Sequence, residues 1–309
     1  MDNTGVTLAG PFASLTLKNP VLTASGTFGY GLEFAPYGDL RKLGGIVVKG
    51  LSLKPREGNP MPRTAESACG LLNAVGLQNC GAEAFLRDIL PALPADKVPV
   101  IANLYGTTPE EFAELAGMLS DEKGIAGIEV NISCPNVREG GQLFGQDPRL
   151  AAAVTAAVRA RAGRLPLIVK LTPNVTDIAA VARACEDAGA DIISCINTLS
   201  GTAVDLVTRK PRLSVTFGGL SGPAVKPVAL RCVLQVARAV SIPVIGIGGI
   251  RCAEDVLEFI LVGAHAVQVG SASFSCPDTV FRIVEELPAV AEKYGVADWE
   301  SFRASLITD

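Results

Sequence analysis

Short apolar runs alternate eight times with stretches of helical periodicity, and this repetition constrains the fold of the 309-residue chain most strongly. The runs are nearly all apolar, which is typical of parallel strands covered on both faces. We expect strands at Val21–Ser25, Gly45–Gly50, Val98–Tyr105, Gly127–Ser133, Leu165–Leu171, Asp191–Asn197, Ile242–Gly249 and Ala266–Gly270. The stretches between them favour helices, for example at Pro109–Ser120, Pro148–Arg161, Val175–Ala188, Ala224–Ala239 and Ala253–Leu261.

Eight βα units predict an α/β fold, a closed (β/α)8 or TIM barrel, with a doubly wound open sheet as the alternative. Polar residues and glycines at the carboxyl ends of the runs favour the barrel, because those ends converge there on one mouth. They are Ser25, Lys49, Asn103, Asn131, Lys170, Asn197, Gly248 and Gly270. We find no linker, so residues 1–309 are expected to form a single domain.

Two segments fall outside the repeat. Residues 6–17 are expected to form a small N-terminal β-hairpin that closes the bottom of the barrel. Residues 199–223 form an insertion after the sixth strand, which we interpret as a lid or an interface element.

Composition excludes several classes of protein. A formal net charge of −4 with 49% apolar residues fits neither a disordered chain nor a basic nucleic-acid binder. The eight cysteines show no C-x-x-C or C-x4-C spacing, and His265 is the single histidine, so a cluster or zinc centre within this chain is not expected. No apolar run reaches the roughly 18 residues that span a bilayer, and the first ten residues lack signal character. We therefore expect a cytoplasmic protein with reduced thiols and no membrane partner.

The segment NISCPNVREGG (131–141) places Cys134 in a loop directly after a strand that ends at Asn131. A cysteine over a barrel mouth is placed to act on a ligand, and Gly140 and Gly141 would let its loop move. A free cysteine is more often packed as a small apolar residue, which is our interpretation for the other seven cysteines. For Cys134 the polar neighbours disfavour packing, and both interpretations stay open at this point.

Amides and lysines also gather at the strand ends. NAVGLQN (73–79) adds two loop asparagines to Asn103, Asn131 and Asn197, a set whose amides suit a neutral or anionic heterocycle. Lys49 and Lys170 end apolar strands, where a lysine needs an anionic partner. That partner is either an internal carboxylate such as Glu129 or a carboxylate, phosphate or flavin ring of a ligand, and we favour the ligand.

Glycines end the last two strands in PVIGIGGI (243–250) and VQVGSAS (267–273). Gly248, Gly249, Gly270 and Ser271 expose backbone N–H groups where the seventh and eighth βα loops of barrels bind phosphate. The G-x-G-G string lacks the spacing of a Rossmann fingerprint.

Taken together, these segments resemble the dihydroorotate dehydrogenases from about residue 5 to 295. The matching motifs are TASGTFGYG (23–31), VVKG (47–50), NAVGLQN (73–79), NISCPNV (131–137), VKLTPN (169–174), INT (196–198), GGLSG (218–222), GIGGI (246–250) and VGSASF (269–274). The cysteine in NISCPN is similar to the class 1 enzymes, and CPNVREGG with GLQN resembles the NAD-linked type 1B. Cys80 departs from the pattern, which has proline after GLQN.

The resemblance implies oxidation of dihydroorotate to orotate in de novo pyrimidine (UMP) biosynthesis, with FMN as the cofactor of this chain. It implies FMN contacts from Ser25, Lys49, Gly50, Asn103, Asn131, Lys170, Ile196, Gly222, Gly248, Gly249, Gly270 and Ser271. It implies substrate contacts from Lys49, Asn73, Ala74, Val75, Gly76, Leu77, Asn131, Asn197 and Thr198. Cys134 would take a proton from the substrate while a hydride passes to N5 of FMN.

The resemblance further implies that electrons pass to NAD through a partner subunit carrying FAD and a [2Fe-2S] cluster. The expected assembly is a homodimer within a heterotetramer. Alternatives are a type 1A homodimer that reduces fumarate and a dihydropyrimidine dehydrogenase-like flavoprotein acting on uracil or thymine. A different class is a non-redox isomerase or aldolase barrel that uses the same phosphate loops and Lys170.

Overall fold

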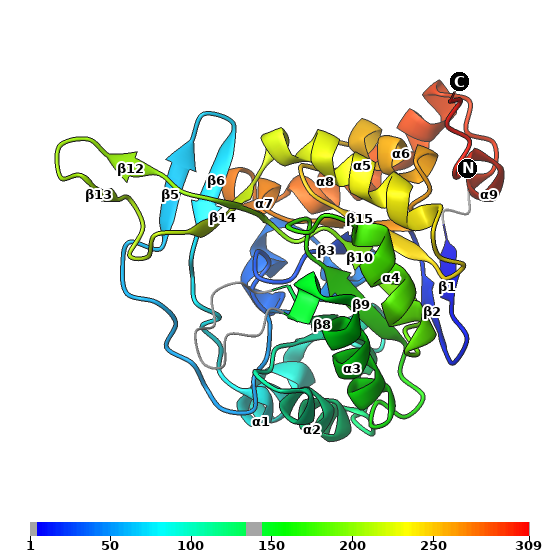
Figure 1. Cartoon of the computed structure of the whole chain (residues 1–309). Coiled ribbons are helices and arrows are strands. Elements are labelled where there is room, and N and C mark those ends of the chain that lie inside the picture. The colour runs from blue at the N-terminus through cyan, green and yellow to red at the C-terminus, as the bar shows by residue number, and fades with distance from the viewer. Residues whose placement is uncertain (1–4, 134–143, 309) are drawn as a thin grey trace.

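A parallel sheet of eight strands forms the centre of the computed structural model, which describes residues 5–133 and 144–308. The sheet order is β3-β16-β15-β10-β9-β8-β7-β4. The strands are β3 (Val21–Thr23), β4 (Ile46–Val47), β7 (Val100–Leu104), β8 (Ile125–Asn131), β9 (Leu167–Leu171), β10 (Ile192–Cys195), β15 (Val244–Ile247) and β16 (Ala266–Val269). Hydrogen bonds from Thr23 N to Gly45 O (3.1 Å) and from Gly44 N to Val21 O (2.9 Å) join the two ends of the sheet. The predicted closed barrel is therefore confirmed, and each expected strand lies in it (Figure 1).

Helices follow the strands and surround the barrel. They are α1 (Ala82–Ala84), α2 (Pro109–Leu119), α3 (Pro148–Arg159), α4 (Ile178–Asp187), α5 (Lys226–Ala237), α6 (Ala253–Leu261), α7 (Ala272–Ser275), α8 (Thr279–Lys293) and α9 (Trp299–Phe302). Shorter 3-10 or π segments occupy Leu32–Tyr37, Leu40–Lys42, Phe85–Ile89, Leu90–Ala92, Phe144–Gln146 and Pro223–Val225. Side chains cap the first turns of α2, α3 and α4 through Thr108, Asp147 and Asp177, which fixes where these helices begin.

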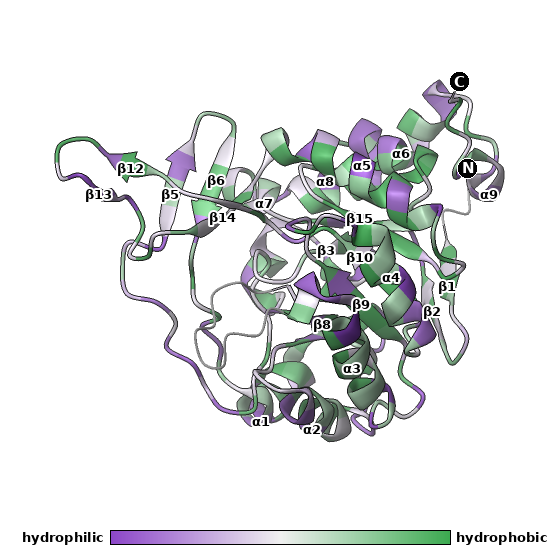
Figure 2. Cartoon of the chain, viewed as in Figure 1, coloured by the Kyte–Doolittle hydropathy of each residue, from purple (hydrophilic) through white to green (hydrophobic). Residues whose placement is uncertain are grey.

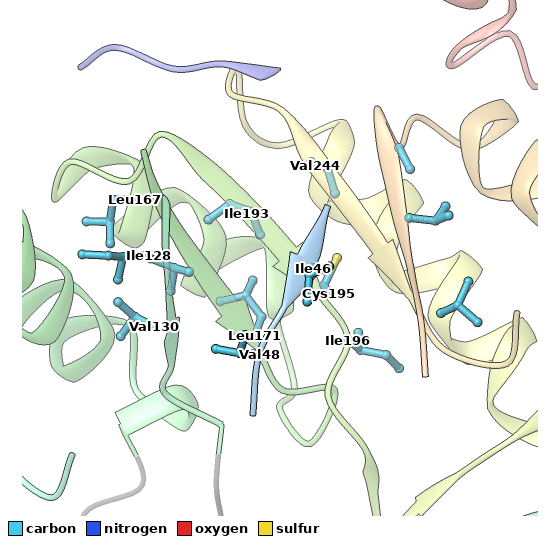
Figure 3. Packing of buried hydrophobic residues seen from close by; sticks show 14 of the residues in the cluster. Ile46, Val48, Ile128, Val130, Leu167, Leu171, Ile193, Cys195, Ile196 and Val244 are labelled. Carbon is cyan, nitrogen blue, oxygen red and sulfur yellow. The ribbon is translucent and has the colours of Figure 1, made fainter. Parts of the chain in front are cut away.

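Side chains of the barrel strands alternate between two faces. The outward residues, such as Ile128, Val130, Leu171 and Ile193, are fully buried beneath the helices (Figure 3). The helices turn one apolar face to this layer, and Figure 2 shows hydrophobic and hydrophilic residues alternating along α5 and α6. The strands are mostly apolar because helices cover their outer face and the barrel interior covers the other.

The amino end of the barrel is filled by one apolar cluster. It contains Leu8, Leu15, Leu17, Leu22, Val47, Ile101, Ile168, Ile192, Ile245 and Ala266. The first three belong to the hairpin of β1 (Val6–Ala9) and β2 (Ser14–Leu17), so the predicted hairpin does close the barrel bottom. The Asp191 carboxylate holds this hairpin, since it accepts hydrogen bonds from the backbone N–H of Phe12 (2.8 Å) and Ala13 (3.0 Å) and pairs with Arg159 (2.9 Å).

A second, antiparallel sheet lies over the other end of the barrel (Figure 1). Its order is β11-β14-β6-β5, formed by β11 (Leu199–Gly201), β14 (Gly218–Ser221), β6 (Gly70–Asn73) and β5 (Thr64–Ser67). The predicted insertion supplies β11, β14 and a hairpin of β12 (Val204–Asp205) and β13 (Lys210–Pro211) that extends away from the barrel. The β5–β6 hairpin was not predicted, and it places Asn73 at the end of a strand instead of in a loop.

Candidate active site

Two cavities that share six lining residues lie where the barrel strands end. The larger, of about 190 Å³, is lined by Ser25, Gly26, Thr27, Lys49, Gly50, Thr64, Asn73, Val75, Gly76, Leu77, Asn103, Asn131, Lys170, Asn197, Thr198, Gly219, Ser221 and Phe274. The smaller, of about 80 Å³, is lined by Ala24, Ser25, Thr27, Lys170, Ile196, Asn197, Thr198, Leu220, Ser221, Gly222, Val225, Ile247, Gly248, Gly249, Ile250, Gly270 and Ser271. The polar strand-end residues that the sequence pointed to therefore converge on one mouth.

Several amide side chains line the larger cavity. Asn197 Nδ2 donates to Asn131 Oδ1 over 3.3 Å, which joins the ends of β10 and β8. Asn73 Nδ2 donates to the Gly219 carbonyl over 3.2 Å, which fixes β6 against β14. These bonds leave further donors and acceptors of the amides for a planar polar ring.

Lys49 brings a positive charge to the same cavity. Burial lowers the pKa of its ammonium, and the nearby Arg63 guanidinium lowers it further. Among the described residues no carboxylate forms an ion pair with Lys49, so its charge is available to an anionic ligand. Arg63 itself is tied to the cavity loops, donating to Gln78 Oε1 (2.6 Å) and the Glu57 carbonyl (2.8 Å).

Lys170 lines both cavities and sits above a buried carboxylate. Its Nζ lies 3.6 Å from Glu129 Oε1 and 3.4 Å from Ser25 Oγ. Of the two partners weighed for this lysine, the internal carboxylate is therefore present, and Lys170 also lines both cavities, where a ligand could meet it. Glu129 is fully buried and lies one layer above the apolar cluster of the barrel bottom.

Backbone of unusual conformation forms the smaller cavity. Gly248 and Gly249 have φ of +129° and +76°, a region that side chains rarely adopt. A Cβ at Gly249 would lie 2.8 Å from the backbone nitrogen of Lys226, so the loop packs closely on the start of α5. Asp255 secures the loop after β15, because it accepts from Arg251 N (2.7 Å) and pairs with Lys226 (2.6 Å).

These residues fit an FMN. A Cβ at Gly270 would meet nothing closer than 3.5 Å, so its bare backbone leaves space beside the glycine loop for a phosphate. The larger cavity offers a heterocycle two cations and, at Asn103 Oδ1, a buried acceptor without a partner among the described residues. No group of three or more His, Cys, Asp or Glu side chains in the described part of the chain could hold a metal ion. In the same part, no helix is long and apolar enough to cross a bilayer.

A (β/α)8 barrel whose mouth joins a lysine- and amide-lined cavity to a glycine-rich loop fits a flavin-dependent oxidoreductase. Comparison with known proteins narrows the class. The family model described as "Dihydroorotate dehydrogenase" matches residues 7–291, and the chain belongs to this family.

Three relatives carry the name "Dihydroorotate dehydrogenase B (NAD(+)), catalytic subunit". The protein of Solidesulfovibrio magneticus is 64% identical over 304 residues, which cover 98% of either chain. The protein of Maridesulfovibrio salexigens is 63% identical over 96% of this chain and 97% of its own. The protein of Pelobacter propionicus is 60% identical over 92% of this chain and 93% of its own.

Of the predicted site residues, one is not described by the structure and one lines neither cavity. Cys134 falls outside the described residues. Ala74 lines neither cavity; it is fully buried in a small core with Ala65, Leu72 and Leu213. The other predicted site residues line one cavity or both.

Sequence reasoning missed several lining residues that belong to motifs it had singled out. They are Gly26 and Thr27 in TASGTFGYG, Gly219 and Ser221 in GGLSG, and Phe274 in VGSASF, together with Thr64 outside any motif. The first five could have been found by assigning every residue of each motif, and not only selected ones, to the loops at the mouth of the barrel. Thr64 gives no such signal, because only the folded β5–β6 hairpin brings it there.

The cysteines other than Cys134 are buried, exposed or half-buried, and Cys252 belongs with Cys80 to the last group. Cys185, Cys195 and Cys232 are buried, as the packing interpretation predicts, and burial raises the pKa of Cys185 to about 12. That interpretation is wrong for Cys69 and Cys276, which are exposed because Cys69 lies in the turn of the β5–β6 hairpin and Cys276 directly follows α7. Cys80 is half-buried, and its thiol donates to the Tyr30 hydroxyl over 3.2 Å outside both cavities.

Proposed function

We propose that this chain, as a single barrel domain, is the catalytic subunit of an NAD-linked dihydroorotate dehydrogenase. It would oxidise dihydroorotate to orotate in de novo pyrimidine (UMP) biosynthesis. The observation that carries the proposal is the continuity of a cation- and amide-lined cavity with a glycine-rich phosphate loop. The names of the relatives support the choice of substrate and of NAD.

The chain would hold FMN across both cavities. Gly222, Gly248, Gly249, Gly270 and Ser271 would hold the phosphate, because they surround the smaller cavity with backbone. The ring contacts would come from Ser25, Lys49, Gly50, Asn103, Asn131, Lys170 and Ile196. When bound, FMN supplies the acceptor for the hydride that the substrate loses.

The substrate would lie in the larger cavity. Lys49 would meet the carboxylate, since its ammonium has no ion-pair partner in the described chain. Asn73, Asn131, Asn197 and Thr198 would fix the pyrimidine ring with the loop of Val75, Gly76 and Leu77 beside it, and Ala74 would support that loop. A lysine placed for a carboxylate favours dihydroorotate over uracil or thymine.

Cys134 would act as the base that removes the proton from C5 of the substrate. The first described stretch ends at Ser133, whose hydroxyl donates to the Lys170 carbonyl over 2.7 Å, so the cysteine follows a residue anchored at the mouth. A free thiol has a pKa near 8.5, which is close to that of a useful base at neutral pH.

Electrons would leave through a second subunit that carries FAD and a [2Fe-2S] cluster, in a heterotetramer built on a homodimer of this chain in the cytoplasm. The words "catalytic subunit" in the names of the relatives support a separate partner. The sequence supports it as well, because its cysteines have no cluster spacing.

The choice of electron acceptor can be tested by measuring orotate formation with fumarate, with NAD alone and with NAD plus the electron-transfer subunit. We expect rapid turnover only in the third mixture. Rapid turnover of the isolated chain with fumarate would instead identify a type 1A homodimer, and rapid reduction of NAD by the isolated chain would remove the need for a partner.

A further inference from the structure

A buried carboxylate lies beneath the larger cavity and has no part in the proposed chemistry. Glu129 in β8 accepts hydrogen bonds from Asn103 Nδ2 (2.7 Å), Ser194 Oγ (2.9 Å) and Gln268 Nε2 (2.7 Å). Its Oε1 also lies 3.6 Å from the Lys170 ammonium. Three donors and a cation around one carboxylate are the surroundings of its ionised form.

The bond to Glu129 decides which way the Asn103 amide faces. An ionised carboxylate only accepts hydrogen bonds, so Asn103 must turn its NH2 group toward Glu129. Oδ1 of Asn103 then points the other way, and it is buried without a partner in the described chain. A Cβ added at Gly50 would lie 3.0 Å from this oxygen, and both residues line the larger cavity.

An acceptor buried without a partner is costly, which indicates that a bound group completes it. We infer that Glu129 is a positioning residue, which fixes the Asn103 amide so that its oxygen accepts a hydrogen bond from the ring N–H of FMN. The inference rests on the proposed function, because it takes FMN as the ligand of the cavity. Glu129 acts through Asn103, while the cofactor meets only Asn103.

The orientation of the Asn103 amide can be tested by exchanging this amide and the carboxylate of Glu129. The substitutions Asn→Asp and Glu→Gln leave the size of each side chain nearly unchanged. In Asn103→Asp, two carboxylates would face each other where a 2.7 Å hydrogen bond lies now. The exchange variant combines Asn103→Asp with Glu129→Gln. It again pairs a donor with an acceptor, with the donor now at position 129. An oxygen at position 103 then faces the cavity as before, and the network keeps one negative charge.

Glu129→Gln alone is the matched control. The Lys170 ammonium beside Oε1 favours an oxygen at that position, so the new amide still accepts from Asn103. Its NH2 group then donates to Ser194 Oγ and to Gln268, whose amide turns so that Oε1, now without a partner among the described residues, accepts. Ser194→Ala is a second control, since it removes a donor to Glu129 without touching Asn103. Thermal melting shows which variants are folded.

The measurement is the Kd for FMN of the flavin-free full chain, followed by fluorescence quenching. Asn103→Asp should weaken FMN binding roughly tenfold or more, because a buried hydrogen bond becomes a repulsion. The exchange variant, Glu129→Gln and Ser194→Ala should each bind within about threefold of the unmodified chain. The exchange variant and the unmodified chain should also prefer FMN over 3-methyl-FMN, which lacks the ring N–H; a purely structural role of Glu129 would not restore that preference.

An exchange variant that is folded but binds no better than Asn103→Asp would overturn the inference. The same follows if Asn103→Asp binds FMN normally or the unmodified chain does not distinguish FMN from 3-methyl-FMN. If Asn103→Asp does not fold, the inference is tested by comparing the exchange variant with the unmodified chain in their Kd for FMN and their preference for FMN over 3-methyl-FMN. Failure of the unmodified chain to bind FMN would instead overturn the proposed function itself.

Discussion

The Lys170 ammonium lies 3.6 Å from the Glu129 carboxylate inside the barrel and faces both cavities at its mouth. One side chain therefore joins the buried polar layer of the barrel to the space proposed for the cofactor. The side chains of Lys170 and Glu129 are 5% and 0% exposed, so solvent hardly screens their interaction.

Lys170→Met should weaken FMN binding roughly tenfold or more, because it removes the cation expected beside the ring. It should also lower the free energy of unfolding by about 3 kcal/mol, since Glu129 would keep a buried charge without its cation. Fluorescence titration and denaturant unfolding measure the two effects. Lys293→Met, which breaks the exposed pair of Lys293 with Glu254, is the control and should change neither. Unchanged FMN affinity in a folded Lys170→Met variant would contradict the role given to Lys170.

Cys134→Ala should retain FMN and lose turnover by roughly a hundredfold or more, because the proton acceptor is gone while the cofactor residues remain. Stopped-flow absorbance after mixing with dihydroorotate measures flavin reduction separately from flavin content. Cys276→Ala, which removes an exposed thiol, should leave both quantities unchanged. Flavin reduction at a normal rate in Cys134→Ala would exclude this cysteine as the base.

Lys49→Met should raise the KM for dihydroorotate roughly tenfold or more, through loss of the cation for its carboxylate. The control is Lys54→Met, because Lys54 is exposed nearby and lines neither cavity. If KM and kcat of Lys49→Met matched those of the unmodified chain, Lys49 would have no part in substrate binding.

The same variant should be more stable than the unmodified chain at neutral pH. Burial lowers the pKa of Lys49 in the folded state, so the unfolded chain holds this proton more tightly. The charge therefore destabilises the fold below the lowered pKa, and stability recovers as pH rises from that value toward the ordinary 10.5. Melting curves of the flavin-free chain against pH should show the advantage of Lys49→Met shrinking over this window. A melting temperature lower than that of the unmodified chain at pH 7 would contradict the account.

Gly270→Ala should affect the space proposed for the phosphate of FMN without affecting the stability of the fold. The new methyl group meets no atom within 3.4 Å, so the melting temperature should change little, yet it enters the smaller cavity. FMN affinity should fall roughly tenfold or more, because phosphate contacts need a close backbone approach. Gly249→Ala is the comparison: with φ of +76° it should lower stability as well. Normal FMN affinity in Gly270→Ala would place the phosphate elsewhere.

The barrel could be predicted because its strands are buried on both faces and therefore read as continuous apolar runs. The polar ends of the same runs revealed the mouth, and most predicted site residues line its cavities. The β5–β6 hairpin gave no comparable signal: its strands are short and partly exposed, and Asn73 pairs with Gly219, 146 residues away. Such pairing depends on the folded chain and leaves no local pattern.

The buried polar network around Glu129 could be predicted from the sequence only in part. Asn103, Glu129, Lys170, Ser194 and Gln268 are polar residues within apolar strands, which is visible in the sequence. Their common inward direction follows from the alternation of strand side chains, once the register of the barrel is known. Sequence reasoning named Glu129 only as a possible partner of Lys170, because its other three contacts come from separate strands.

The visible absorbance of the purified chain, recorded without oxygen before and after addition of dihydroorotate, tests the central claim most directly. We predict a flavin band at about 450 nm that bleaches on addition of the substrate, because FMN in this chain takes the hydride. A purified, folded chain that shows no flavin band and takes up no added FMN, or whose band persists with dihydroorotate, would contradict the account.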